Sequence, residues 1–152
     1  MARKQNRRKA SPAAAILTVL VLAALFVWRM LGSPEDGKTQ ITLPNGELHV
    51  WFLDVGQADS SLLVCDGQAM LIDGGNVDDA SYVVASLEQY GVTSLDYVIN
   101  THCDEDHVGG LAGVLAKFPA EHVWSSTAEY GTKAFSNFVK YANEQGRAIE
   151  IP

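Results

Sequence analysis

The stretch that decides the fold is "INTHCDEDHVGG", residues 99–110. It holds two histidines and three acids within six residues, between an apolar run and a Gly-Gly pair. Such a loop has three interpretations: a solvated acidic turn, a calcium loop, or part of a transition-metal site. The side chains that distinguish between them are those of His102, Asp104, Asp106 and His107.

The calcium interpretation fails on spacing. A calcium loop of the EF-hand type starting at Asp104 would place Val108 fifth and Leu115 twelfth, and neither side chain offers an oxygen. A solvated acidic turn remains the simplest alternative. The mixture of imidazole and carboxylate groups instead suits Zn²⁺, Fe or Mn²⁺. Gly109-Gly110 also allows a second backbone segment to approach closely, so we favour the metal site.

The flanking sequence predicts strands followed by alternating strands and helices. Asp66-Gly67 is a two-residue hairpin signal of the type I′ kind. Strands are predicted at 47–55 (a buried one), 61–65, 68–73, 95–100, 121–126 and 147–151, and helices at 78–90, 110–118 and 132–145. This order favours an α/β (α+β) domain with a mixed sheet and helices packed on it. The candidate metal loop follows a strand and precedes a helix.

Three separated blocks carry a resemblance to a known family. "FLDVGQADSSLLV", "AMLIDGG" and "LDYVINTHCDEDHVGGL", in this order and spacing, resemble the metallo-β-lactamase fold. The closest branch is the extracytoplasmic hydrolase domain of the ComEC competence proteins and its stand-alone relatives. The resemblance covers about residues 47–118 and continues more weakly to 152. It implies the N-terminal half of an αββα sandwich.

The family's metal motif is H-x-H-x-D-H, and Asp104 stands where the general motif has its second histidine. The resemblance implies that His102 and Asp104 bind one metal ion, and that Asp106 and His107 bind another. It also implies that Asp106 is the catalytic group that orients the attacking water. Two divalent ions are expected, Zn²⁺ first, with Mn²⁺ as the alternative because the extra carboxylate favours harder ions.

Other residues near the motifs are assigned by the same resemblance. Asp73 of "LIDGG" is expected to support the metal loop, and Asp59 to lie near it. Ala58 departs from the glycine usual in that block. From the predicted hairpin, Cys65 lies too far from Cys103 for a disulfide. The remaining histidines, His49 and His122, are expected to be structural or surface residues.

Charge divides the chain into a basic head and an acidic body. Residues 1–29 hold six of the eleven bases and no acid, so residues 30–152 carry five bases against eighteen acids, a charge of −13. We predict a basic cytoplasmic region at 1–12, a transmembrane signal anchor at 13–31, a linker at 32–46 and the metallo-β-lactamase-like domain at 47–152. This organisation predicts a single-pass cell-membrane protein with its body outside the cytoplasm.

The predicted function is that of a membrane-anchored, metal-dependent hydrolase, a phosphodiesterase or nuclease of ComEC type. The acidic body disfavours a polyanion such as DNA, so cell-wall phosphodiesters are an alternative substrate. The further metal ligands usual in this fold are not found after His107. The domain is therefore expected to be incomplete, to bind metal weakly and to turn over little. An inactive fragment or a non-catalytic anchored module is the alternative from another class.

Overall fold

Five strands of the described residues form one mixed sheet in the order β1-β2-β3-β4-β5. The structure is a computed structural model that describes residues 21–23 and 43–152. The strands are β1 His49–Phe52, β2 Ser61–Cys65, β3 Gln68–Ile72, β4 Leu95–Asn100 and β5 Ala120–Ser125. β2 pairs antiparallel with both β1 and β3, whereas β3, β4 and β5 are parallel. The mixed sheet that the sequence predicts is confirmed.

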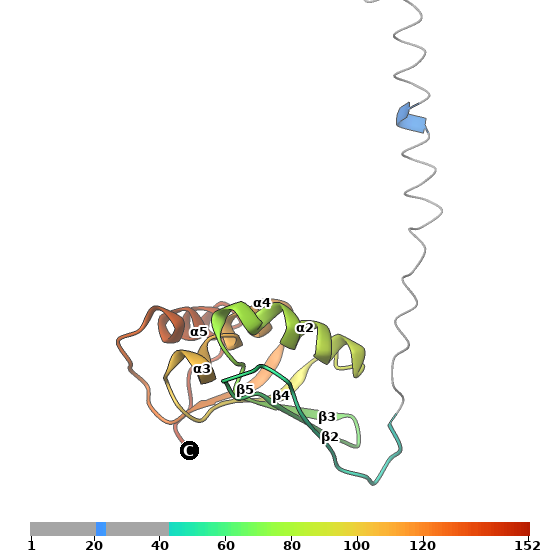
Figure 1. Cartoon of the computed structure of the whole chain (residues 1–152), viewed down its shortest axis with the longest axis horizontal. Helices are drawn as coiled ribbons and strands as arrows, with labels where there is room; N and C mark the ends of the chain where they lie inside the picture. Colours follow the sequence, from blue (N-terminus) through green and yellow to red (C-terminus); the bar gives the residue numbers. More distant parts are fainter. Residues whose placement is uncertain (1–20, 24–42) are drawn as a thin grey trace, which may run out of the picture. The chain divides into compact units, whose positions relative to one another are not determined.

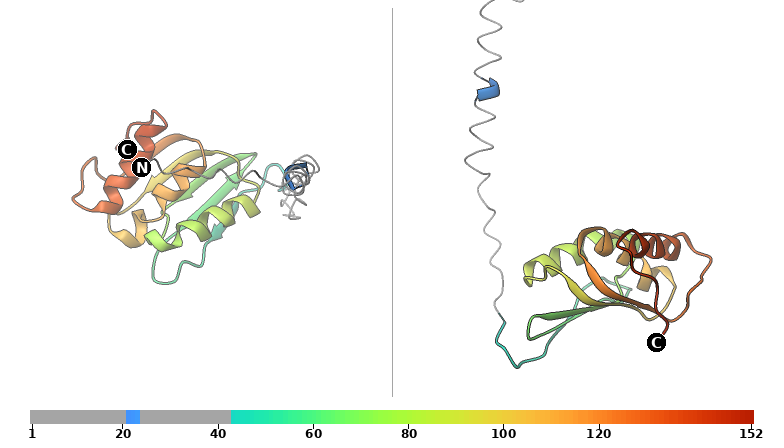
Figure 2. Two further views of the ribbon diagram at one scale, coloured as in Figure 1. Left: turned by 90° about the horizontal axis from the view of Figure 1, so that it is seen from above. Right: turned by 180° about the vertical axis from the view of Figure 1, so that it is seen from behind.

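The helices lie on one face of this sheet, as Figure 1 and the view from behind in Figure 2 show. They are η1 Val77–Asp79, α2 Ala80–Gln89, α3 Glu105–Val108, α4 Leu111–Lys117 and α5 Lys133–Glu144. The parallel strands require crossover connections, which α2 and α4 provide. The predicted helices at 78–90, 110–118 and 132–145 are thus confirmed, with bounds shifted by a few residues.

The core lies between the helices and the sheet. One row of side chains crosses four strands in register, and all four are fully buried: Leu62, Leu71, Val98 and Val123. From the helices, Leu87, Val114 and Phe138 are equally buried. This row fixes the register of the parallel strands, because a shift of one residue would turn it to the other face.

The opposite face of the sheet is also apolar. Phe52 is 84% exposed and Val50 41%, while Tyr97, His122 and Trp124 form stacked and edge-on ring contacts there. Within residues 43–152, no helix covers this face (Figure 2). The described domain is therefore a sheet with one covered and one open apolar face.

Local sequence signals explain the turns and helix ends. Asp66 and Gly67 have φ of 50° and 79°, as a type I′ turn between β2 and β3 requires. Thr132 caps α5 by accepting a hydrogen bond from the Phe135 amide. Gly91, with φ of 78°, follows the end of α2 in the left-handed conformation expected of such a residue.

Two sequence predictions are wrong in detail. The run at 47–55 was expected to be a buried strand, but β1 is shorter and lies at the edge of the sheet with alternating side chains exposed. An apolar run alone does not distinguish a central strand from an edge strand. The strand expected at 147–151 is reduced to a single parallel bridge between Trp124 and Glu150.

The predictions for the head lie almost wholly outside the described residues. This applies to the cytoplasmic region at 1–12, the anchor at 13–31, apart from the helical residues 21–23, and most of the linker at 32–46. Among the described residues, no helix has both the length and the apolar character needed to cross a membrane.

Candidate metal centre

The candidate site forms where two parallel strands end side by side. Ile72 of β3 pairs with Ile99 of β4, so the residues that follow each strand meet at one edge of the sheet. Asp73 comes directly after β3, and its amide donates to the Ile99 carbonyl at 2.8 Å. Thr101 and His102 come directly after β4. The carboxyl ends of parallel strands are a common location for functional groups.

Backbone hydrogen bonds join the three sequence blocks to one another at this end of the sheet. The Asp59 amide donates to the Asp106 carbonyl at 3.0 Å, and the Gly75 amide donates to the Asp59 carbonyl at 2.9 Å. The Gly74 amide donates to the His107 carbonyl at 2.7 Å. The blocks around Asp59, Asp73 and His102 are therefore adjacent in space although they are far apart in the sequence.

The Gly-Gly pair at 109–110 allows these backbone segments to lie close together. A Cβ atom on Gly110 would lie 2.0 Å from the Gly74 carbonyl oxygen, and one on Gly74 would lie 2.6 Å from the Leu111 amide nitrogen. The Gly110 amide donates to the Gly75 carbonyl at 3.0 Å. The close backbone approach predicted from the glycines is thus present, and its partner is the "DGG" turn after β3.

The carboxylate of Asp73 holds the candidate metal loop through hydrogen bonds. Its side chain is buried, and its residue has a φ of 58°, a left-handed conformation that aspartate tolerates better than most residues. One carboxylate oxygen accepts from the Thr101 amide, and the other accepts from the Thr101 hydroxyl and from Nδ1 of His107 at 3.0 Å. The structure thus places Asp73 in hydrogen-bond contact with two residues of the candidate metal loop, Thr101 and His107.

This hydrogen bond sets the tautomer of His107. A carboxylate at Nδ1 holds the proton there, so Nε2 carries the lone pair that a metal ion needs. Nε2 points toward Asp59, whose Oδ2 lies 3.7 Å away. The Asp73–His107 arrangement is the type of carboxylate contact that accompanies most metal-binding histidines.

His102 and Asp104 form a second pair of donors on the surface of the loop. His102 Nε2 lies 3.0 Å from Asp104 Oδ2, and the rings of His102 and His107 are 5.6 Å apart. The other Asp104 oxygen accepts a hydrogen bond from the Tyr130 hydroxyl at 2.9 Å. Tyr130 was not predicted from the sequence, because no local signal links it to a loop 26 residues earlier.

The site perturbs the acidity of three of its groups. The Tyr130 hydroxyl, followed by His102, lowers the pKa of Asp104. The same hydrogen bond raises the pKa of Tyr130, since the phenolate would face a carboxylate. The hydrogen bond that His107 donates to the Asp73 carboxylate raises the pKa of His107. The pKa of Asp104 is lowered because its carboxylate accepts hydrogen bonds, whereas the raised pKa values of Tyr130 and His107 each reflect a neighbouring carboxylate.

The donor set fits divalent ions, although it is arranged as separate pairs. Across residues 21–23 and 43–152, no three His, Cys, Asp or Glu side chains are disposed as ligands of one ion. His102 lies with Asp104, and His107 lies with Asp73 and Asp59. Asp106 is half-buried beside them, and among the described residues none donates a hydrogen bond to its carboxylate. Imidazole nitrogens and carboxylate oxygens together suit Zn²⁺ or Mn²⁺.

The cysteines and the other histidines lie away from these donors. Both cysteines are free, and the Cys103 thiol is buried beneath the loop, 3.3 Å from the Asn100 amide. His122 contacts Glu150 through Nδ1 at 3.0 Å and stacks on Tyr97. His49 stacks on Trp51 near the sheet edge. His49 and His122 therefore occupy the structural or surface positions expected from the sequence, and the cysteines form no disulfide with each other, as predicted.

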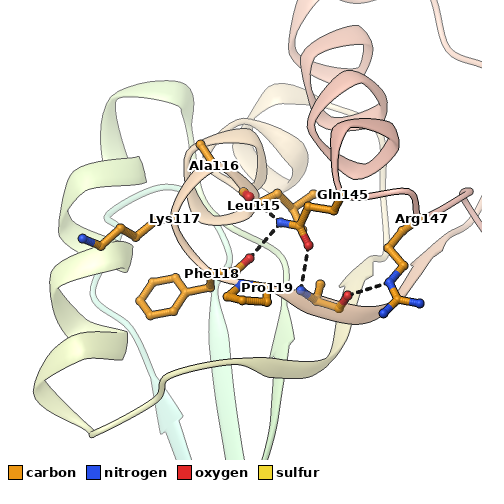
Figure 3. Close-up of a pocket in the computed structure, with 8 residues that line it drawn as sticks. Leu115, Ala116, Lys117, Phe118, Pro119, Gln145 and Arg147 are labelled. Atoms are coloured by element: carbon orange, nitrogen blue, oxygen red, sulfur yellow. Dashed lines mark hydrogen bonds between the residues drawn. The ribbon is translucent and has the colours of Figure 1, made fainter.

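A cavity of about 370 Å³ lies at the opposite end of β5, where the strand begins. Figure 3 shows its organising residue, Gln145, which donates to the carbonyls of Leu115 and Phe118 and accepts from the Ala120 amide. Arg147 donates to the Ala120 carbonyl at 3.0 Å. The side-chain amide of Gln145 is thus fully engaged with backbone groups, and its hydrogen bonds connect the end of α5 to the end of α4. The cavity is therefore a packing feature.

The mixed sheet, the helices on one face and the histidine–carboxylate loop at the strand ends define an α/β domain with a candidate metal loop. A family model described as the metallo-β-lactamase superfamily matches residues 53–149. The chain belongs to this superfamily, which supports the hydrolase class expected from the sequence. The fold also implies divalent metal ions as cofactors.

The chain is similar over part of its length to individual curated proteins and solved structures. The chain is 33% identical over 113 residues to the competence protein ComA of Neisseria gonorrhoeae, which covers 74% of this chain and 15% of that protein. It is 33% identical over 86 residues to recombination protein 2 of Haemophilus influenzae, covering 52% and 11%. A solved structure of a mutant metallo-β-lactamase from Cronobacter sakazakii is 31% identical, with a TM-score of 0.45, over 52% of this chain and 31% of that one. The chain thus spans a small part of the curated relatives it matches.

Proposed function

We propose that this protein is a metal-dependent phosphodiesterase whose centre is built on His102, Asp104, Asp106 and His107. The observation that carries the proposal is the hydrogen bond from His107 Nδ1 to the buried Asp73 carboxylate. It leaves Nε2 facing Asp59 Oδ2 at 3.7 Å, on the same edge where His102 Nε2 and Asp104 Oδ2 lie 3.0 Å apart. A solvated acidic turn would not need a buried carboxylate to orient one of its histidines.

Divalent ions held by these residues would make water a stronger acid at neutral pH and offset the negative charge that develops during displacement. In this proposal, His102 and Asp104 would hold one ion, and His107 and Asp106 would hold the other. The Asp106 carboxylate, which no described residue engages by a hydrogen bond, orients the attacking water and accepts its proton. Asp73 keeps the His107 ring in place throughout.

The proposal extends to architecture and location. We propose that the sheet is an inner layer of an αββα sandwich, which the open apolar face around Phe52, Tyr97 and Trp124 supports. The anchor at 13–31 would hold the domain outside the cytoplasm, with the five bases that precede it marking the cytoplasmic side. A nucleic-acid phosphodiester is the first candidate substrate in this proposal, as the resemblance of the motif blocks to the ComEC competence proteins implies.

The charge of the body favours a second substrate class. Residues 30–152 carry five bases and eighteen acids, whereas nucleic-acid binding usually depends on a basic surface. Cell-wall phosphodiester polymers, which include less densely charged chains, are therefore the alternative substrate. Hydrolysis of single-stranded DNA compared with a teichoic-acid polymer distinguishes the two.

The activity test is metal-dependent hydrolysis of bis-p-nitrophenyl phosphate by the whole chain in detergent. We expect a low rate in Mn²⁺ or Zn²⁺, because few protein ligands are available to each ion. Removal of the metal with EDTA should abolish that rate, and restoring the ion should recover it. A rate that EDTA leaves unchanged, or no metal-dependent release of nitrophenol at high enzyme concentration, would contradict the proposed function.

A further inference from the structure

The loop between β5 and α5 carries a tyrosine to the candidate metal centre. Tyr130 is 43% exposed, and its hydroxyl donates to Asp104 Oδ1 at 2.9 Å. The second oxygen of the same carboxylate, Oδ2, faces His102 Nε2 at 3.0 Å. The two oxygens of Asp104 therefore have different partners, and only Oδ2 lies beside a histidine nitrogen.

The position of Tyr130 is fixed from both ends of its loop. On the helix side, its ring meets the buried Phe135 edge-on at 6.2 Å, and Thr132 caps α5. On the strand side, the Ser126 amide donates to the Asn100 carbonyl at 3.2 Å, directly beneath the metal loop. Because these contacts already fix the position of Tyr130, its hydrogen bond to Asp104 costs little further conformational entropy.

We propose that Tyr130 is a positioning residue of the metal centre, which holds Asp104 Oδ1 so that Oδ2 is presented to an ion shared with His102. This inference rests on the proposed function and adds a residue to it. Carboxylates that bind metals are themselves held by hydrogen bonds, and loss of such a partner typically weakens metal binding about 10–100-fold. Tyr130 acts on the metal through Asp104 and is not itself a ligand.

The replacement that tests this inference is Tyr130→Phe, which removes the hydroxyl and keeps the ring on Phe135. The matched control is Tyr82→Phe on α2, because Tyr82 is 46% exposed and its hydroxyl has no hydrogen-bond partner among the described residues. Zn²⁺ affinity is measured by calorimetry on the whole chain in detergent. The absorption spectrum of bound Co²⁺ reports the coordination geometry independently of any hydrolysis.

We expect Tyr130→Phe to weaken Zn²⁺ binding about tenfold and to change the Co²⁺ spectrum. Tyr82→Phe should do neither, and both variants should unfold at the same temperature as the wild type because both side chains are exposed. Equal affinity and an unchanged spectrum in Tyr130→Phe, with the wild type binding metal, would overturn the role of Tyr130 alone. Absence of metal binding in the wild type would overturn the proposed function and this inference together.

Discussion

Replacing Gly110 with alanine is expected to destabilise the fold by about 3 kcal/mol or more. The added methyl group would lie 2.0 Å from the Gly74 carbonyl oxygen and 3.0 Å from its carbonyl carbon. Both are backbone atoms, so no side chain can rotate away to relieve the clash. Separation of the two segments would also break the hydrogen bonds from Gly74 to His107 and from Gly110 to Gly75.

The measurement is urea unfolding followed by circular dichroism, with Gly131→Ala as the matched control. Gly131 is exposed, and a Cβ atom there would meet nothing within 4 Å. The control should change the free energy of unfolding by less than about 0.5 kcal/mol. If Gly110→Ala were as stable as Gly131→Ala, the packing of the metal loop against the "DGG" turn would not be as described.

Replacing Asp106 with asparagine is expected to lower the metal-dependent rate of phosphodiester hydrolysis by about 10²–10⁴-fold. Asparagine has nearly the same size but cannot accept a proton, and it is a poorer partner for a divalent ion. The variant should remain folded, since among the described residues none donates a hydrogen bond to the Asp106 carboxylate. Rates are compared at equal protein and Mn²⁺ concentration.

Glu105→Gln is the control for this variant, because it removes one charge from the neighbouring position of α3. Glu105 is exposed and is not a member of the proposed centre. The Glu105→Gln variant should hydrolyse the substrate at a rate within about twofold of the wild-type rate, as expected for a screened surface charge. Equal losses in the two variants would show that the overall negative charge of the loop, and not Asp106, supports the reaction.

Local signals were sufficient to predict most of the sheet. The strand at 95–100 was identified by its apolar run, and the β2–β3 hairpin by Asp66-Gly67, where only residues that accept positive φ fit. The helix at 132–145 was identified by its apolar periodicity. Each of these signals lies within the element that it specifies, so the sequence contains it directly.

The features that the sequence did not predict depend on contacts between segments that are distant in the sequence. The exposure of Phe52 follows from the edge position of β1, which no run of residues reveals. The Gly-Gly pair predicted a close approach but not its partner, Gly74. Tyr130 reaches Asp104 only because the loop after β5 returns across the end of β4. Candidate ligands could thus be predicted from one motif, whereas the residues that orient them could not.

The metal centre itself is tested most directly by the imidazole ¹⁵N resonances of the chain, whose four histidines provide their own controls. His102 and His107 lie in the proposed centre, whereas His122 and His49 are engaged by Glu150 and Trp51 elsewhere in the domain. On titration with Zn²⁺, the account predicts that the signals of His102 and His107 shift together and that those of His49 and His122 stay in place. Unchanged signals from His102 and His107, or equal shifts at all four histidines, would contradict it.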